Sequence, residues 1–103
     1  MKPAVQRALA QQDISDAFDH YLNVASAAIA TNFVLEFDAC MQRIEHLPGA
    51  GSLRYAELLD VEGLRFVIVN RYPYLVFYFE SPDHLDVVRL LHQLQDIPAI
   101  LLT

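Results

Sequence analysis

A chain of 103 residues has the usual length of one domain, and 54% of its residues are hydrophobic whereas 19% are charged. This composition is richer in apolar side chains than that of a typical soluble domain, which argues against disorder and predicts surplus apolar surface for the core or for a partner. Seven basic and thirteen acidic residues give a net charge of −6, which argues against direct binding to nucleic acid.

The sequence also argues against a membrane protein, a secreted protein and a metal-binding protein. No apolar stretch reaches the roughly 18 to 20 residues that cross a bilayer, and the start lacks the apolar stretch of a secretory signal. The single cysteine, Cys40, excludes an internal disulfide and a cysteine-rich zinc site. Paired metal-ligand spacing is also missing among the histidines, which are His20, His46, His84 and His92. We therefore expect a cytoplasmic protein with no cofactor, no metal and no membrane contact.

The first half of the chain is predicted to form a hairpin of two helices behind a short extended segment, 3–7. From Asp13 onward apolar residues recur at helical spacing and leave the acidic side chains on the opposite face. A second apolar stripe follows Ser26, whose hydroxyl is suited to cap a helix, and runs to Leu47. Pro48 and the glycine after it end this helix. The short break between the two helices favours an antiparallel hairpin.

The second half is predicted to form three strands. Runs rich in β-branched and aromatic residues cover 64–69, 74–79 and 85–91, and the short breaks between them favour an antiparallel meander. The middle run is apolar on both alternating faces, so we expect helices on one side of it and a partner on the other. The last residues, 96–103, are unusually apolar for a chain end. This order of elements predicts an α+β fold in one domain, 1–103.

Four groups in the second half that can carry positive charge form the main candidate site. Arg65, Arg71, Arg89 and His92 lie on or beside the predicted strands, and the strand pairing can bring Arg89 near the first two arginines. Such a cluster can grip an RNA phosphate, or a carboxylate of a protein partner in a bidentate pair. Alternatively, each arginine simply pairs with a nearby acid such as Glu80, and there is no site.

The other reactive side chains have simpler structural interpretations. Cys40 falls in the apolar stripe of the second helix, where burial suppresses the ionisation of a thiol. Asp13, Asp16 and Asp19 are spaced so that they spread along a solvated helix flank. A ribonuclease without a metal needs a general acid and a general base, and the second half offers only His92, Glu80 and its tyrosines for these roles.

The pattern as a whole resembles the ParE branch of the RelE/ParE toxin superfamily. The likeness rests on the order strand, helix hairpin and three-stranded meander, and on a basic residue, an aromatic, Pro-Tyr, an apolar pair and Phe-Tyr at 71–78. It rests further on Arg89 and His92 closing the last strand, and on the loop 47–52 after the hairpin. The chain departs from the pattern at 93–96, where many relatives carry a glycine and one or two arginines.

The resemblance implies a type II toxin that binds a ParD-type antitoxin in a hetero-oligomer. In such systems the C-terminal segment of the antitoxin wraps around the toxin and buries its apolar surface. ParE members are associated with inhibition of DNA gyrase, whereas RelE members cleave messenger RNA on the ribosome. The sequence favours the ParE side, and we assign no catalytic residue.

The expected contact residues differ for the two kinds of partner. For the target of the toxin we expect contact with basic and aromatic groups of the strand half, which are Arg71, Tyr74, Arg89 and His92. For the antitoxin we expect contact with large apolar side chains, which are Phe18, Tyr21, Leu22, Phe33, Phe37 and Tyr78.

Two other functions remain open from the sequence. One is a RelE-like, metal-independent endoribonuclease that uses Arg65, Arg71, Arg89 and His92. The other is a non-toxic remnant kept as an interaction module, which the departure at 93–96 favours.

Overall fold

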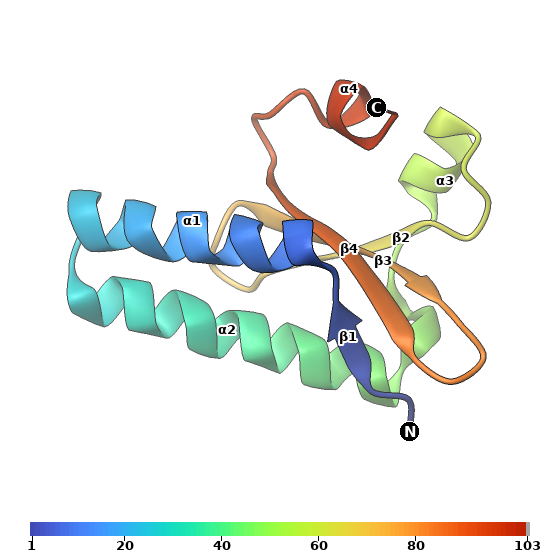
Figure 1. Ribbon diagram of the computed structural model, residues 1–103, viewed down its shortest axis with the longest axis horizontal. Coiled ribbons are helices and arrows are strands. Elements are labelled where there is room, and N and C mark those ends of the chain that lie inside the picture. The colour runs from blue at the N-terminus through green and yellow to red at the C-terminus, as the bar shows by residue number, and fades with distance from the viewer. Residues whose placement is uncertain (103) are drawn as a thin grey trace.

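The computed structural model describes residues 1–102 and consists of a helical hairpin packed on one face of a four-stranded sheet, with two short helices on the other face (Figure 1). The sheet order is β1-β4-β3-β2. In chain order the elements are β1 (Ala4–Gln6), α1 (Ala8–Val24), α2 (Ala27–His46), a 3₁₀ turn η1 (Pro48–Ala50), α3 (Arg54–Leu59), β2 (Arg65–Ile68), β3 (Tyr74–Glu80), β4 (Leu85–His92) and α4 (Ile97–Leu101).

The helical hairpin forms as predicted, with one difference at its start. The Ser26 hydroxyl accepts a hydrogen bond from the Ile29 N–H at 3.1 Å and so caps α2, which ends just before Leu47 and the proline. However, α1 begins at Ala8 rather than near Asp13. The first turn is rich in alanine and glutamine, which favour a helix, and Ala10 is fully buried against the sheet.

The sheet is mixed rather than purely antiparallel. The predicted meander is confirmed, because β2 pairs with β3 and β3 with β4 in antiparallel register. The short strand β1 pairs with β4 in parallel, with Val5 opposite Asp86. Backbone bonds of 2.9 Å from the Arg7 N–H to the Val87 carbonyl and of 2.8 Å from the Leu85 N–H to the Pro3 carbonyl hold it there.

A buried tyrosine joins the hairpin exit to the sheet. The Tyr78 hydroxyl donates to the Pro48 carbonyl at 2.7 Å and accepts from the Gly51 N–H at 3.0 Å. Arg65 lies opposite Tyr78 in the sheet and donates to the carbonyls of Gly49 and Gly51 at 3.2 and 2.8 Å. Burial raises the pKa of the Tyr78 hydroxyl and keeps the proton that it donates. These bonds hold the whole loop after α2 against the sheet.

Much of the second face of the sheet, where we expected a partner, is covered by the chain itself. Phe77 and Leu91 point to this side and are fully buried beneath α3 and α4. Ile97, from the apolar chain end, is 2% exposed in the same cluster. The Asp96 side chain accepts from the Ala99 N–H and starts α4. Part of the apolar surplus is therefore used within the fold, because the end of the chain folds back.

Candidate functional site

An ion pair between α1 and β4 organises the end of the last strand. Arg89 donates from Nε and Nη2 to the two carboxylate oxygens of Asp13 at 2.7 and 3.0 Å. The Leu90 N–H donates to the same carboxylate at 3.0 Å, beyond the point where β1 stops pairing with β4. The bond to Asp13 raises the pKa of Arg89 because it stabilises the charged guanidinium. Asp13 thus closes the free edge of β4 and neutralises Arg89.

His92 is held at the end of β4 by its neighbours in the chain. Its Nδ1 accepts a hydrogen bond from the Leu94 N–H at 3.0 Å, so the neutral ring carries its hydrogen on Nε2. Its backbone N–H donates to Gln95 Oε1 at 2.7 Å, and its ring lies edge to face with Tyr74 at 5.1 Å. The residues that depart from the ParE pattern therefore build the turn that leads into α4.

The pocket beside His92 is acidic. It has a volume of about 260 Å³, and its walls include Asp13 and Asp16 as well as His20 and Tyr74. The lining contains no arginine or lysine that could bind a phosphate group, which disfavours RNA at this place. Among residues 1–102, no three side chains of histidine, cysteine, aspartate or glutamate are arranged to hold a metal ion.

The four basic groups of the predicted cluster are divided between different parts of the fold. Arg65 donates its hydrogen bonds to the carbonyls of Gly49 and Gly51 in the loop after α2. Arg71 lies in the turn between β2 and β3 with φ of 72°, in the left-handed region that favours glycine. That turn is next to the residues after β4, because the Gln93 N–H donates to the Pro73 carbonyl at 2.9 Å. Arg71 and His92 therefore share one end of the sheet, from which Arg65 is separate.

The apolar residues predicted to meet an antitoxin fall into two groups. Phe33, Phe37 and Tyr78 are at most 2% exposed and lie between the helices and the sheet, so in this conformation they offer no surface to a partner. Tyr21 is half-buried, and its ring packs against Phe33 at 5.5 Å. Burial raises the pKa of the Tyr21 hydroxyl. Of the predicted set, Leu22 is exposed, and Tyr21 and Phe18 are partly exposed.

Cys40 lies in the core, as its position in the apolar stripe predicts. The thiol is 1% exposed and donates weakly to the Ile68 carbonyl at 3.5 Å. Burial raises the pKa of this thiol, which opposes formation of the nucleophilic thiolate.

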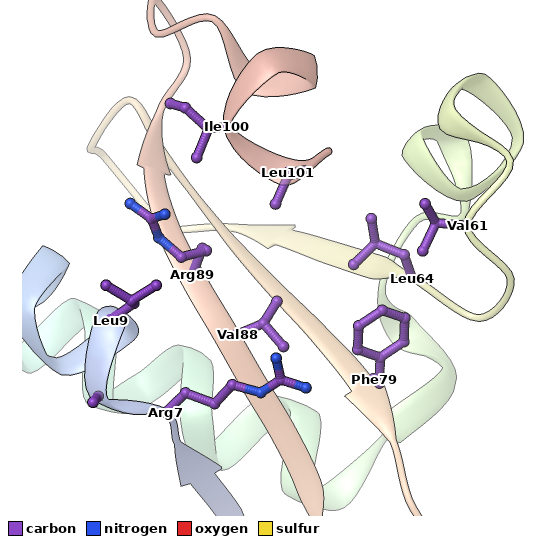
Figure 2. A pocket seen from close by; sticks show the side chains of 10 residues that line it. Arg7, Leu9, Val61, Leu64, Phe79, Val88, Arg89, Ile100 and Leu101 are labelled. Carbon is purple, nitrogen blue, oxygen red and sulfur yellow. The ribbon is translucent and has the colours of Figure 1, made fainter. Parts of the chain in front are cut away.

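Sequence reasoning missed a groove on the second face of the sheet. Figure 2 shows Arg7 and Leu9, at the start of α1, on one side of it, and Val88 and Arg89 of β4 beside them. The groove has a volume of about 480 Å³. The exposed Leu9 lies outside the helical stripe toward the core, which is the one sequence signal that points to it.

No helix within residues 1–102 combines the length and the apolar character needed to cross a membrane.

Comparisons with known proteins agree with this fold. The fold is similar to that of a chain in a solved structure of the chromosomal ParDE toxin–antitoxin system from P. aeruginosa, with a TM-score of 0.76. The match covers 89% of this chain and 96% of that chain, at 18% sequence identity. A search of curated proteins found no match. The family described as the ParE toxin of the type II toxin–antitoxin system parDE matches residues 5–97. Because that match spans nearly the whole chain, the protein belongs to the ParE toxin family, and the predicted α+β fold of this family is confirmed.

Proposed function

We propose that the chain works in the cytoplasm as a toxin held by a ParD-type antitoxin in a stable hetero-oligomer. The family match over residues 5–97 carries this proposal. Uncovered apolar surface supports it, because Leu22, Val24 and Ile29 are exposed at the tip of the helical hairpin and Leu9 is exposed at the start of α1. Burying such surface stabilises a complex by about 25 cal/mol per Å² before the costs of association.

Co-expression with the product of the neighbouring open reading frame tests the antitoxin. We expect the two proteins to co-purify in a fixed ratio and to elute together in size-exclusion chromatography. An unrelated acidic protein of similar size, co-expressed in the same way, is the control and should not co-purify. A chain that elutes as a monomer in the presence of its neighbour would contradict the proposal.

We further propose that the released toxin inhibits DNA gyrase by binding it, with Arg71, Tyr74, Arg89 and His92 nearest to the contact. The state of the basic groups supports protein binding over RNA cleavage. Arg89 is paired with Asp13, and the pocket beside His92 is lined by carboxylates. Arg71, in contrast, is exposed and forms no ion pair within residues 1–102. Keeping an arginine where glycine is favoured costs about 1 kcal/mol, which is consistent with use of its side chain.

A supercoiling assay with purified gyrase tests the target. We expect the wild-type chain to inhibit supercoiling and Arg71→Ala to weaken inhibition about tenfold, since arginine side chains often dominate protein interfaces. Arg54→Ala, at another exposed arginine at the start of α3, is the matched control and should inhibit like the wild type. Unchanged supercoiling together with ribosome-dependent cleavage of messenger RNA would instead select the ribonuclease.

A further inference from the structure

The turn between β2 and β3 keeps Arg71 in a conformation that arginine disfavours. Its φ of 72° lies in the left-handed region, and a side chain other than glycine stays there only when the surrounding structure fixes it. The turn has two backbone bonds of its own. The Tyr72 N–H donates to the Val69 carbonyl at 3.1 Å, and the Val69 N–H donates to the Tyr74 carbonyl at 2.9 Å. We therefore looked for contacts that fix the turn from outside.

One such contact is the hydroxyl of Tyr72, which reaches the first turns of α2. It donates to Asn32 Oδ1 at 2.8 Å, and the Ile29 carbonyl lies 3.2 Å from the same hydroxyl. Because a phenol has one proton, the shorter bond is the main one and the carbonyl is a second acceptor. Asn32 is half-buried, although asparagine favours a helix less than most residues do. The bond thus joins the turn to a helix that lies 40 positions earlier in the chain.

The ring of Tyr72 and the residue after it are also fixed. The ring lies edge to face with Tyr21 of α1 and with Phe33 of α2, in both cases at 5.2 Å between centroids. The Pro73 carbonyl accepts from the Gln93 N–H at 2.9 Å. The two residues that directly follow the exposed arginine are therefore attached to the helical hairpin and to the end of β4.

We infer that Tyr72 is a positioning residue, whose bond to Asn32 keeps the turn on α2 and so presents the guanidinium group of Arg71 to the target of the toxin. The inference rests on the proposed function, in which Arg71 contacts gyrase. Tyr72 acts through Arg71 rather than by touching the target, because its hydroxyl is directed at α2. A side chain on a fixed turn loses less conformational freedom when it binds, which strengthens binding.

The chain contains a second pair of arginine and tyrosine that serves as a matched control. Arg54 and Tyr55 begin α3. The ring of Tyr55 lies edge to face with Phe66 and Phe77, much as the Tyr72 ring lies against its neighbours. Within residues 1–102, however, the Tyr55 hydroxyl forms no hydrogen bond. Replacing each tyrosine by phenylalanine therefore removes an anchoring bond in one case and none in the other.

The gyrase supercoiling assay gives the first measurement. We expect Tyr72→Phe to raise the concentration of half-maximal inhibition about threefold, because the freed turn has to be ordered on binding. Tyr55→Phe should inhibit like the wild type. Both variants keep their aromatic rings and should fold, which circular dichroism and thermal unfolding check.

A double-mutant cycle with Arg71→Ala separates positioning from a general structural role. If Tyr72 acts through Arg71, Tyr72→Phe has no further effect once the arginine is gone, so the double variant should inhibit like Arg71→Ala alone. A threefold loss that persists beside Arg71→Ala would show that Tyr72 acts independently, through folding or through its own contact with gyrase. That result would overturn the inference and leave the gyrase proposal intact.

Limited digestion with trypsin, which cleaves after arginine and lysine, follows the turn without gyrase. Tyr72→Phe should speed cleavage after Arg71 at least about threefold while cleavage after Arg54 stays unchanged, because only the turn opens more often. Tyr55→Phe makes the same exchange next to Arg54 and should leave cleavage there unchanged. Equal rates after Arg71 in the wild type and Tyr72→Phe would overturn the inference, as would faster cleavage after both arginines.

The two assays distinguish failure of the inference from failure of the proposed function. A wild-type chain that leaves supercoiling unchanged would overturn the gyrase proposal and, with it, the presentation of Arg71 to gyrase. A wild-type chain that inhibits gyrase, together with a Tyr72→Phe variant that inhibits equally well, would overturn the positioning role alone.

Discussion

Gly51→Ala is expected to lower the free energy of unfolding by about 3 kcal/mol, because it forces a methyl group into a packed site. A Cβ at this position would lie 2.5 Å from Tyr78 Oη and 2.9 Å from Arg65 Cβ. Tyr78 cannot move aside without losing its bonds to Pro48 and to the Gly51 N–H. Urea-induced unfolding followed by circular dichroism measures the loss.

Gly49→Ala is the matched control, since a Cβ at that position would meet nothing within 4 Å. It should change the unfolding free energy by less than about 0.5 kcal/mol. Tyr78→Phe combined with Gly51→Ala should cost less than the sum of the two single changes, because both act on the same contact. Equal losses for Gly49→Ala and Gly51→Ala would show that the loop does not pack as described.

Asp13→Asn is expected to destabilise the protein by about 2 kcal/mol, because a neutral amide cannot replace the carboxylate. Asp13 is 14% and Arg89 23% exposed in their side chains, so solvent screens this pair only partly. The amide has one acceptor oxygen, and it cannot serve both donors of Arg89 and the Leu90 N–H together. Thermal or urea unfolding gives the size of the effect, and amide hydrogen exchange at Leu90 should become faster.

Asp19→Asn removes the same charge from the exposed part of α1 and serves as the control. Its effect should stay within about 0.5 kcal/mol. If Asp13→Asn and Asp19→Asn were equally mild, the ion pair between Asp13 and Arg89 would not hold α1 to β4.

Much of the fold is readable from the sequence, because it depends on neighbours in the chain. The cap of α2 joins Ser26 to Ile29, and the end of that helix follows from a proline. The strands β2, β3 and β4 follow from runs of β-branched and aromatic residues that are separated by short turns. These signals are local, so composition and periodicity within a few residues suffice to recognise them.

The candidate site was less predictable, because distant residues build it. Asp13 and Arg89 are separated by 76 positions in the chain, and no periodicity connects a helix flank with a strand end. Sequence reasoning placed Asp13 on a solvated face and looked for the partners of Arg89 in its own half. It also placed Phe33 and Phe37 at an interface, whereas packing against the sheet uses their whole surface.

The sequence by itself determined the two long helices, the three long strands, their order and the family, since each depends on local patterns or on motifs along the chain. Tertiary structure alone decided the parallel pairing of β1, the return of the apolar chain end onto the second face, and the groove with Arg7 and Arg89. An apolar residue in a sequence indicates that its side chain will be buried, but it does not indicate which surface will cover that side chain. In the same way, an arginine indicates a positive charge but not the residue with which that charge pairs. That choice is made only when the helices and the sheet pack together.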